Sequence, residues 1–419
     1  MSFLIILVFL GAAAAAVPIA HALLAAALAA AATSDRVPMD ILVQTMVQQV
    51  QSFPLIAIPF FMLTGSLMMG GKLGEALIGT LSTVLGRYHG GPGQVGVLSS
   101  TIFGGVSGSA VADASAIGSL MIPWHKRLGY PAAFSAATLA AAATIDILIP
   151  PSIPMILFAL SSGASIAALF VAGILPGLLM CGGFMAVCWW VGKRRNFPRE
   201  TRPWDGKAFA AQFAYASPAL LLPVLIIIFL RFGIATPTEV SVLSTLFAGL
   251  VSAVVYRDLT WERLHKAVVE AGLSTGVVLL VIMASAAIGW LLTFDQMPNG
   301  IVTWAQKNLT EPWVIILMMN LLMLVCGMFI DLPAAVLLLT PVFVPLAKSI
   351  GMDMTQLGIM MTVNLAIGLY TPPVGTTLFI TSSVAKVKIG ETVRELKPFY
   401  FVAFLVLLLV SYVPASIIR

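Results

Sequence analysis

The fold of this chain is decided by two stretches, Asp146-Ile-Leu-Ile149-Pro150-Pro151 and Gly368-Leu-Tyr-Thr371-Pro372-Pro373, both set in long apolar segments. Tandem prolines cannot continue an α-helix, because two backbone donors are missing and the rings clash with the preceding turn. Inside a bilayer, a broken helix survives only where it is buried in protein or lines a polar cavity. A matched pair of broken segments therefore indicates the binding site of a secondary transporter.

The composition places the chain in a membrane. It has 419 residues, of which 60% are hydrophobic and 9% charged, and its mean hydropathy is +1.03. Soluble domains carry roughly 25% charged residues, and the apolar residues run continuously instead of alternating as in a β-barrel. We therefore expect an all-α polytopic membrane protein. The net charge of +5 is an orientation signal, since Lys and Arg mark cytoplasmic loops. No basic stripe with interleaved aromatics indicates nucleic-acid binding.

Several apolar segments are long enough to cross a bilayer at about 20 residues per span. The first has no basic residue before it, so we expect a retained helix rather than a cleaved signal peptide. The segments lie at residues 3–32, 53–70, 167–192, 212–232, 236–256, 273–294, 312–330 and 398–417.

Broken apolar segments occur twice in the same order. Each set predicts a re-entrant hairpin, a span, a break and a further half-helix, because short apolar pieces are typical of such elements. The first set covers hairpin 99–123, span 130–145, break 146–151 and helix 152–165; the second covers hairpin 327–350, span 353–367, break 368–373 and helix 374–386. The order predicts an internal repeat, and transporters built this way usually have repeats of inverted topology.

The chain divides into five parts on this basis. Residues 91–166 and 297–388 form the two repeats of a transport domain, each a hairpin plus a broken helix, and the rest forms a scaffold. The scaffold parts are 1–90, with an interfacial arm; 167–296, with a basic cytoplasmic linker at 193–211 and an arm at 257–272; and 389–419, an arm followed by a helix.

The first hairpin carries polar groups suited to a small ligand. Gly108 permits a tight turn, and Ser107 and Ser109 add hydroxyl oxygens. Carbonyl and hydroxyl oxygens suit a hard cation such as Na⁺, whereas the amides of a half-helix N-terminus suit a carboxylate. Gly375 and Thr376 open the half-helix after the second break, so its amides point back toward the same place.

Three carboxylates are expected at membrane depth: Asp113, Asp146 and Asp331. A carboxylate at the centre of a membrane helix costs about 2.5–3.5 kcal/mol, so it usually has a partner or lines a wet cavity. Basic residues are nearly absent from the broken segments, which leaves a cation, a proton or backbone amides as partners. For Asp331, which precedes Leu332-Pro333, a helix N-cap is an equally good interpretation. Glu239, in Thr236-Pro237-Thr238-Glu239, is expected to cap a scaffold helix.

An enzyme is not expected. Gly105-Val106-Ser107-Gly108-Ser109 nearly matches a serine-nucleophile pattern, but the last position is Ser, and the four histidines offer no base near it. A nucleotide-driven pump is also disfavoured, because the phosphate-binding G-x-x-x-x-G-K-[ST] pattern is missing from the sequence. The energy for transport must come from an ion gradient or a partner.

The chain resembles, over nearly its whole length, the large membrane subunit of the tripartite ATP-independent periplasmic (TRAP) transporters. The most specific stretches are Ser107-Gly108-Ser109-Ala110, Ile149-Pro150-Pro151-Ser152-Ile153-Pro154, Gly233-Ile-Ala-Thr236-Pro237-Thr238-Glu239 and Gly368-Leu-Tyr-Thr371-Pro372-Pro373-Val374-Gly375. The resemblance implies an elevator-type fold and Na⁺-coupled import of an organic acid across the bacterial inner membrane. It also implies a small four-helix membrane subunit and a periplasmic binding protein as partners, and no organic cofactor.

The resemblance also implies positions for the ligands. Na⁺ is expected between each hairpin tip and the neighbouring break, with the substrate between the two sites. The Na⁺ ligands would be Ser107, Ser109, Asp146, Ile149 and Pro150 at the first site, and Gly327, Gly368 and Thr371 at the second; the substrate would contact Ser107, Gly108, Ser109, Asp113, Asp331, Pro333, Gly375 and Thr376.

Asp146 departs from the family pattern, which more often has glycine there. A carboxylate at this position would bind the cation directly or titrate, so proton coupling stays open. Dicarboxylates, sialic acids, other sugar acids, keto acids and sulfonates are all compatible as substrates. The alternative function is a stand-alone cation-coupled anion carrier, or an ion channel or exchanger, that uses the same broken helices without a binding protein.

Overall fold

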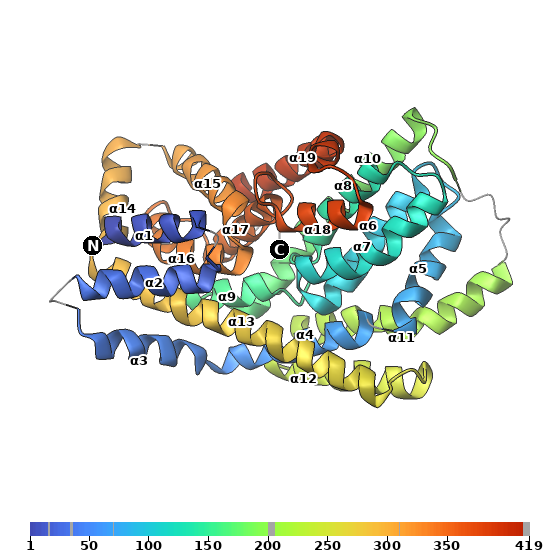
Figure 1. Ribbon diagram of the computed structural model, residues 1–419, viewed down its shortest axis with the longest axis horizontal. Coiled ribbons are helices and arrows are strands. Elements are labelled where there is room, and N and C mark those ends of the chain that lie inside the picture. Colours follow the sequence, from blue (N-terminus) through green and yellow to red (C-terminus); the bar gives the residue numbers. More distant parts are fainter. Residues whose placement is uncertain (16, 34–36, 70, 200–205, 310, 414–419) are drawn as a thin grey trace.

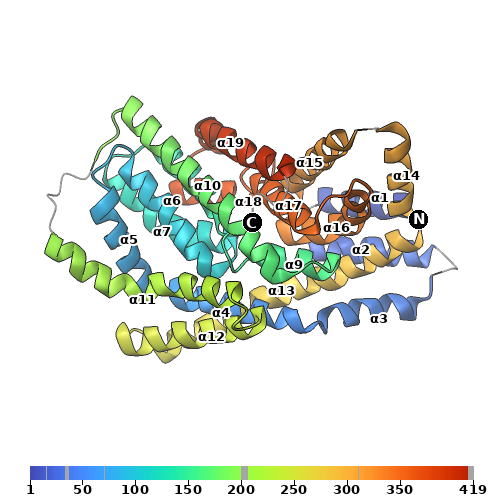
Figure 2. The same ribbon diagram turned by 180° about the vertical axis from the view of Figure 1, so that it is seen from behind.

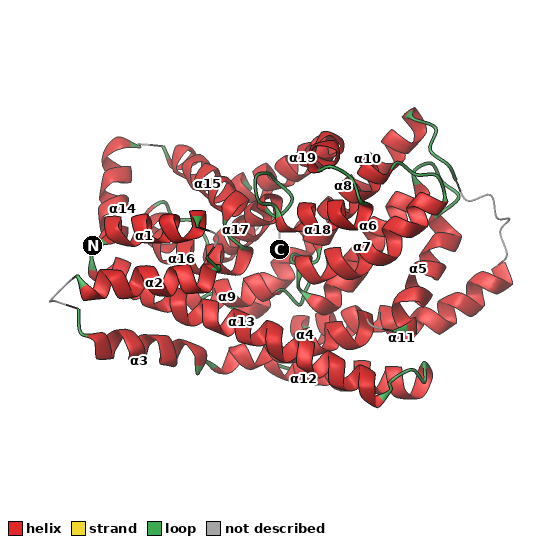
Figure 3. Cartoon of the chain, viewed as in Figure 1, coloured by secondary structure: helices red, strands yellow, loops and turns green. Residues whose placement is uncertain are grey.

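The computed structural model describes residues 1–15, 17–33, 37–69, 71–199, 206–309 and 311–413. Every regular element in these ranges is helical (Figure 3). On length and composition, five of the described helices can cross a membrane, and two bent pairs raise the number to seven. The all-α membrane fold expected from the composition is confirmed.

Two units repeat the same order of elements: a hairpin, a broken helix and a long helix. The first unit consists of α6 (Gly91–Ser107), α7 (Ala110–Arg127), α8 (Ala132–Ala142) with the 3₁₀ turn η2 (Ala143–Ile145), α9 (Ile153–Ser162) and α10 (Ile166–Arg194). The second consists of α15 (Pro312–Phe329), α16 (Leu332–Ser349), α17 (Met354–Gly368), α18 (Thr376–Ala385) and α19 (Ile389–Tyr412). The hairpins turn at Gly108 and at Ile330–Asp331, and both proline pairs contain a cis peptide bond.

The two units interlock at the centre of the molecule (Figure 1). Helix α18 of the second unit packs on α7 and α8 of the first, and α9 packs on α16 and α17. The Thr377 hydroxyl of α18 donates to the Ala140 carbonyl of α8 at 3.1 Å. Helices α8 and α17 are buried along almost their whole length. The first break, residues 146–151, is buried in protein, as broken backbone in a membrane requires, whereas Pro373 at the end of the second break is exposed.

The remaining helices flank these units. Helix α13 is the longest and runs most of the length of the molecule, beside α2, α3 and α4 (Figure 2). Helix α12 packs on α4, and α11 on α5. The bounds are α1 (Ser2–Ala14), α2 (Ile19–Ala32), α3 (Met39–Val50), η1 (Phe53–Ile56), α4 (Ala57–Met69), α5 (Lys72–Leu85), α11 (Gly206–Arg231), α12 (Pro237–Leu250), the π-turn η3 (Val251–Val255), α13 (Trp261–Phe294) and α14 (Met297–Asn308).

The helices start where the sequence supplies caps. Ser109, Ser152 and Thr260 stand directly before α7, α9 and α13, and each side chain accepts a backbone N–H of the first turn. Thr236 and Glu239 form a reciprocal capping box at α12. The capping role predicted for Glu239 is confirmed, because its carboxylate accepts from the Thr236 N–H at 2.7 Å.

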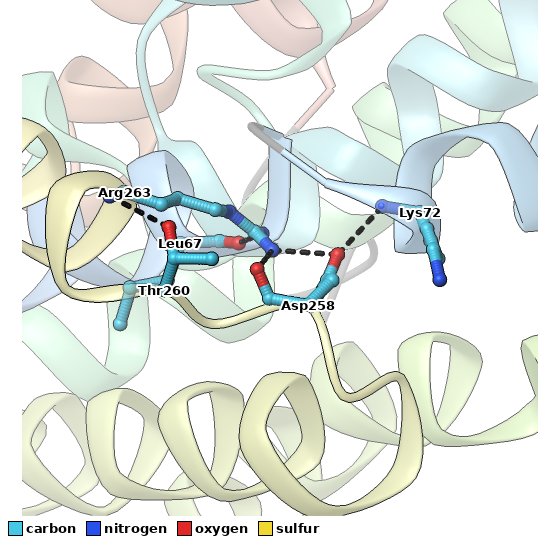
Figure 4. Close-up of polar contacts among 5 residues, drawn as sticks. All are labelled: Leu67, Lys72, Asp258, Thr260 and Arg263. Carbon is cyan, nitrogen blue, oxygen red and sulfur yellow. Dashed lines mark hydrogen bonds and ion pairs between the residues drawn. The ribbon is translucent and has the colours of Figure 1, made fainter.

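A polar clasp, formed by Asp258 and Arg263, joins the α12–α13 turn to the α4–α5 connection (Figure 4). Arg263 Nη1 lies 2.6 Å from Asp258 Oδ2, and Nη2 donates to the Leu67 carbonyl in the last turn of α4. Asp258 Oδ2 also accepts from the backbone N–H of Lys72, the first residue of α5, at 2.9 Å. The Arg263 guanidinium thus stabilises the C-terminal end of α4, and the Asp258 carboxylate stabilises the N-terminal end of α5. The helix dipoles favour both placements.

Three details differ from the sequence predictions. Residues 3–32 are not one span but two packed helices, α1 and α2, because Pro18 stands directly before α2. Segment 312–330, predicted as a span, forms α15, which is long and apolar enough to cross a membrane and leads through the turn at Ile330–Asp331 into α16. The pair α15–α16 covers 312–349, whereas the predicted hairpin covered 327–350. The first hairpin likewise covers 91–127 instead of 99–123. Apolar composition alone cannot separate a re-entrant arm of this length from a span.

The arms expected at 257–272 and at the start of 389–419 are not separate elements either. Helix α13 begins at Trp261 and continues without a break to Phe294, and α19 continues from Ile389 through Pro398 to Tyr412. Each polar first turn therefore belongs to the same rigid helix as the apolar part that follows.

Candidate functional site

A cavity of about 260 Å³ lies where the two hairpin turns and the two breaks meet. Gly108 and Ser109 come from the first turn, and Asp331 and Pro333 from the second. The remaining wall residues belong to the breaks and half-helices (Ala110, Val111, Ile147, Ile153, Pro154, Leu332, Leu369) and to the flanking helices α4 and α13 (Met62, Ser274, Val277, Val278). We call this space the central cavity.

Three helix N-termini open onto the central cavity. Its wall includes the first two residues of α7, of α9 and of α16. Pro154 and Pro333 carry no N–H, so the donors at these ends come from Ala110, Val111, Ile153 and Leu332. Unpaired N–H groups at helix N-termini carry partial positive charge, which makes them binding points for an anion. None of the described residues that line the cavity is Lys, Arg or His. A carboxylate held here would therefore be bound by backbone amides and hydroxyls rather than by a basic side chain.

At the first break, Asp146 faces the hairpin turn. Its Oδ2 accepts the Ser107 hydroxyl at 2.8 Å and the Ser109 backbone N–H at 3.0 Å. The contact is close because Gly104 has no side chain: a Cβ there would lie 2.5 Å from the Asp146 Cα. Asp146 Oδ1 is buried and has no hydrogen-bond partner among the described residues. An unpartnered carboxylate oxygen beside the Ser107 hydroxyl fits a hard cation such as Na⁺.

At the second break, the break and its hairpin meet through backbone atoms instead of through a side chain. Gly368 lies against Gly327 of α15, so closely that a Cβ on Gly368 would be 2.5 Å from the Gly327 carbonyl oxygen. The Thr371 hydroxyl donates to the Ile367 carbonyl at 2.6 Å, and the Val374 N–H to the Met328 carbonyl at 3.2 Å. This break offers carbonyl and hydroxyl oxygens without a carboxylate.

The residues predicted for the substrate divide into two groups. Gly108, Ser109, Asp331 and Pro333 line the central cavity. The others lie outside its wall: Ser107 is buried beneath the turn, Asp113 is buried in α7, and Gly375 and Thr376 begin α18. Asp331 occupies the N-cap position of α16, where its side chain makes no cap hydrogen bond.

The residues predicted for Na⁺ occur in two places. Ser107, Ser109 and Asp146 come together at the first break, with Ile149 and Pro150 following in the same turn. Gly327 and Gly368 are in contact at the second, and Thr371 follows Gly368 by less than one helical turn.

The flanking wall was missed by sequence reasoning. Met62 of α4 and Ser274, Val277 and Val278 of α13 face the cavity opposite the two turns. Ser274, a hydroxyl within an apolar helix, was a weak indication that α13 lines a cavity. Met62, Val277 and Val278 gave no indication, because apolar residues are equally typical of a lipid-facing span.

Known proteins are similar to this chain over its whole length. Residues 5–416 match the family described as "Tripartite ATP-independent periplasmic transporter, DctM component". An uncharacterized protein of Sinorhizobium fredii is 55% identical over 99% of both chains. The 2,3-diketo-L-gulonate TRAP transporter large permease protein of Escherichia coli is 37% identical over 98% of this chain and 96% of its own.

A solved structure supports the fold. The Alcanivorax borkumensis YdaH transporter superposes with a TM-score of 0.62 over 90% of this chain and 89% of its own, at 15% identity. The overall fold is thus shared, and the family follows from the sequence matches: this chain belongs to the tripartite ATP-independent periplasmic transporters, as their large permease subunit, the DctM component.

Proposed function

We propose that this chain imports a small organic acid across the bacterial inner membrane, driven by Na⁺. The observation that carries the proposal is the central cavity, in which three helix N-termini converge without a basic side chain. Such a wall binds a carboxylate through backbone amides, provided that Asp331, whose carboxylate also lines it, is neutral or paired with a cation. The E. coli relative is named for a diketo sugar acid, which supports an organic acid as the substrate class.

Na⁺ would bind at the two breaks that flank the cavity. At the first, Asp146 Oδ1 and the Ser107 hydroxyl supply oxygens, and at the second the carbonyls around Gly368 and the Thr371 hydroxyl do so. A cation at the first break would also compensate the buried charge of Asp146, which otherwise costs free energy at membrane depth. Cation and substrate would stabilise the same hairpin turns, which couples their binding.

An elevator movement fits the composition of the cavity wall. The turns and breaks supply most of the wall, while α4 and α13 contribute Met62, Ser274, Val277 and Val278. If the paired hairpin units slide as one body against α4 and α13, the substrate stays among its main ligands and only the wall formed by Met62, Ser274, Val277 and Val278 changes. Alternating access of this kind is common in transporters with paired broken helices.

The distribution of charge orients the chain. The carboxyl end of α10, the α12–α13 turn and α5 lie at the same end of the molecule (Figure 1). That end carries Lys193, Arg194, Arg195, Arg257 and Lys266. Basic residues favour the cytoplasmic side, so the opposite end, where α14 lies, would face the periplasm. A periplasmic binding protein would deliver substrate there, and a small four-helix membrane subunit would cover part of the lipid-facing scaffold.

Uptake into proteoliposomes tests the function. The chain is reconstituted with its small membrane subunit, and loaded binding protein and an imposed Na⁺ gradient are supplied outside. We expect uptake only when both are present. Uptake without the binding protein would identify a stand-alone carrier, and ion flux without organic solute would identify a channel or exchanger.

A further inference from the structure

Helix α13 carries three cavities in succession along the seam with the hairpin units. The central cavity contacts α13 at Ser274–Val278. A cavity of about 350 Å³ adjoins it on the basic side, beside Arg263–Glu270 and the α7 arm of the first hairpin. A cavity of about 440 Å³ adjoins it on the other side, beside Ile282–Thr293 and the α16 arm of the second hairpin. We call the last one the outer vestibule.

The outer vestibule has a mixed wall, with polar groups set in a mostly apolar surface. Its wall includes no Asp, Glu, Lys, Arg or His among the described residues. The polar groups that face it are neutral hydroxyl, amide and indole groups, from Thr45, Gln49, Ser161, Ser285, Trp290 and Thr293. A wall of this kind binds hydroxyl and carbonyl groups rather than ions.

Two features of the wall call for a hydrogen-bonding occupant. Ser285 is 3% exposed, and its Oγ has no hydrogen-bond partner among the described residues. Pro341 and Pro345 lie inside α16 and face the vestibule, and they cannot donate to the carbonyls of Leu337 and Pro341. A buried hydroxyl and two carbonyls that lack their helical partner cost free energy at membrane depth unless water or a ligand satisfies them.

The vestibule also lies next to the central cavity. On two helices, the residues of the two walls are about one helical turn apart, roughly 6 Å. On α13, Val278 lines the central cavity and Ile282 the vestibule; on α16, Pro333 lines the central cavity and Leu337 the vestibule. Helix α9 likewise passes from Pro154 in one wall to Ser161 in the other. The two cavities are therefore neighbours along α13, α16 and α9, although they share no wall residue.

We propose that the outer vestibule is a second binding site, which receives the hydroxyl-bearing part of an organic acid on its way to the central cavity. Ser285, Ser161 and Gln49 are the side chains that contact it. The inference rests on the proposed transport function and extends it to a substrate class, polyhydroxylated or keto acids, because a plain dicarboxylate offers these neutral groups little to bind.

Thiol labelling tests whether water reaches the vestibule. Full-length Ser285→Cys is placed in membrane vesicles with the periplasmic face outward and treated with an anionic, membrane-impermeant methanethiosulfonate. Ala284→Cys is the matched control, because Ala284 is its neighbour on α13, is fully buried and lies outside the vestibule wall. Wild-type protein gives the background of Cys181, Cys188 and Cys326. We expect the reagent to label Ser285→Cys and not Ala284→Cys. Equal labelling of the two variants, or no labelling of Ser285→Cys, would overturn an aqueous site. So would labelling of Ser285→Cys by a lipid-soluble reagent alone.

Protection from labelling tests the ligand class. The reporter is Ser161→Cys, so that Ser285 keeps its hydroxyl. Protection of this cysteine by gluconate is compared with protection by succinate, which carries no alcohol hydroxyl group. We expect gluconate to slow labelling at least about threefold more than succinate does, and Ser285→Ala in the same chain to remove the difference, as the loss of a hydrogen bond implies. Equal protection, or protection that survives Ser285→Ala, would contradict the proposal. Labelling needs neither Na⁺ nor binding protein, so its failure is distinguishable from a failure of uptake.

Discussion

Gly327 of α15 and Gly368 at the end of α17 are in direct backbone contact. A Cβ added to Gly368 would lie 2.5 Å from the carbonyl carbon and oxygen of Gly327. This contact brings the second hairpin against the second break, and the first unit has its counterpart in Gly104 and Asp146. In both units, a hairpin glycine lets the break approach until main-chain atoms touch.

Gly368→Ala should therefore destabilise the protein. The added methyl group meets backbone, which cannot move aside as a flexible side chain can, and overpacking of this kind typically costs about 1–3 kcal/mol. Thermal unfolding of the purified protein, followed by Tm, measures the effect. Gly276→Ala is the matched control, because Gly276 lies within α13 and a Cβ there meets nothing within 4 Å. Similar Tm values for both variants would show that the second break tolerates separation from its hairpin.

Asp146→Asn should weaken Na⁺-dependent uptake. The amide keeps the shape of the carboxylate and an acceptor for the Ser107 hydroxyl, but it removes the charge that would hold a cation. We expect the Na⁺ concentration for half-maximal uptake to rise at least about tenfold, ~1.4 kcal/mol. Initial uptake rates across a Na⁺ series at several pH values provide the measurement. A changed pH profile with an unchanged Na⁺ response would instead assign Asp146 to proton coupling.

Ser107→Ala and Thr371→Ala compare the two breaks. Each removes one hydroxyl oxygen, worth about 0.5–1.5 kcal/mol, so each should raise the half-maximal Na⁺ concentration about twofold to tenfold. The Na⁺ series used for Asp146 measures both. Ser162→Ala is a suitable control, since its hydroxyl donates to the Phe158 carbonyl at 2.7 Å within α9, outside the central cavity. A normal Na⁺ response in both test variants would remove the proposed Na⁺ sites.

The sequence predicted the parts of the site that local chemistry determines. Pro150-Pro151 and Pro372-Pro373 mark the breaks because proline cannot continue a helix, and Gly108 marks a turn because it adopts a positive φ of 63°. These signals need no knowledge of packing. They located the breaks and the first turn, and Gly108, Ser109, Asp331 and Pro333 do line one cavity.

The rest depends on packing, which composition does not record. Helix α15 is long and apolar enough to cross a membrane, so its composition did not reveal that it packs against α17. Met62 and Val277 face the central cavity, yet they look like the lipid-facing residues beside them. The pairing of Asp258 with Arg263 was likewise hidden, because both lie in a basic stretch that reads as a solvated surface.

The Asp258–Arg263 clasp should behave as a coupled pair. Both side chains are largely buried, with exposed fractions of 12% and 14%, and breaking a buried pair costs about 3–5 kcal/mol because one charge is left unpaired. We expect Asp258→Asn and Arg263→Gln each to lower Tm, and the double variant to lower it by less than the sum. Lys266 and Glu270, an exposed pair at 3.8 Å, are the control pair. Additive effects at the clasp would show that the two residues act independently.

Ser274→Asp should block the transport of an anion while leaving the fold intact. Ser274 lies on α13 and lines the central cavity opposite the hairpin turns, away from the two breaks. A carboxylate there would add a second acidic group to the wall that already holds Asp331. It would face an organic anion at roughly 6 Å, where like charges repel by about 2–3 kcal/mol at an effective dielectric constant near 20. Uptake should fall at least about tenfold in Ser274→Asp and much less in Ser274→Asn, which has nearly the same size without the charge. The Tm of both variants is measured in parallel. Equal loss in the two variants would mean that the position is sensitive to bulk, and equal retention would mean that the anion passes elsewhere than between α13 and the hairpin turns.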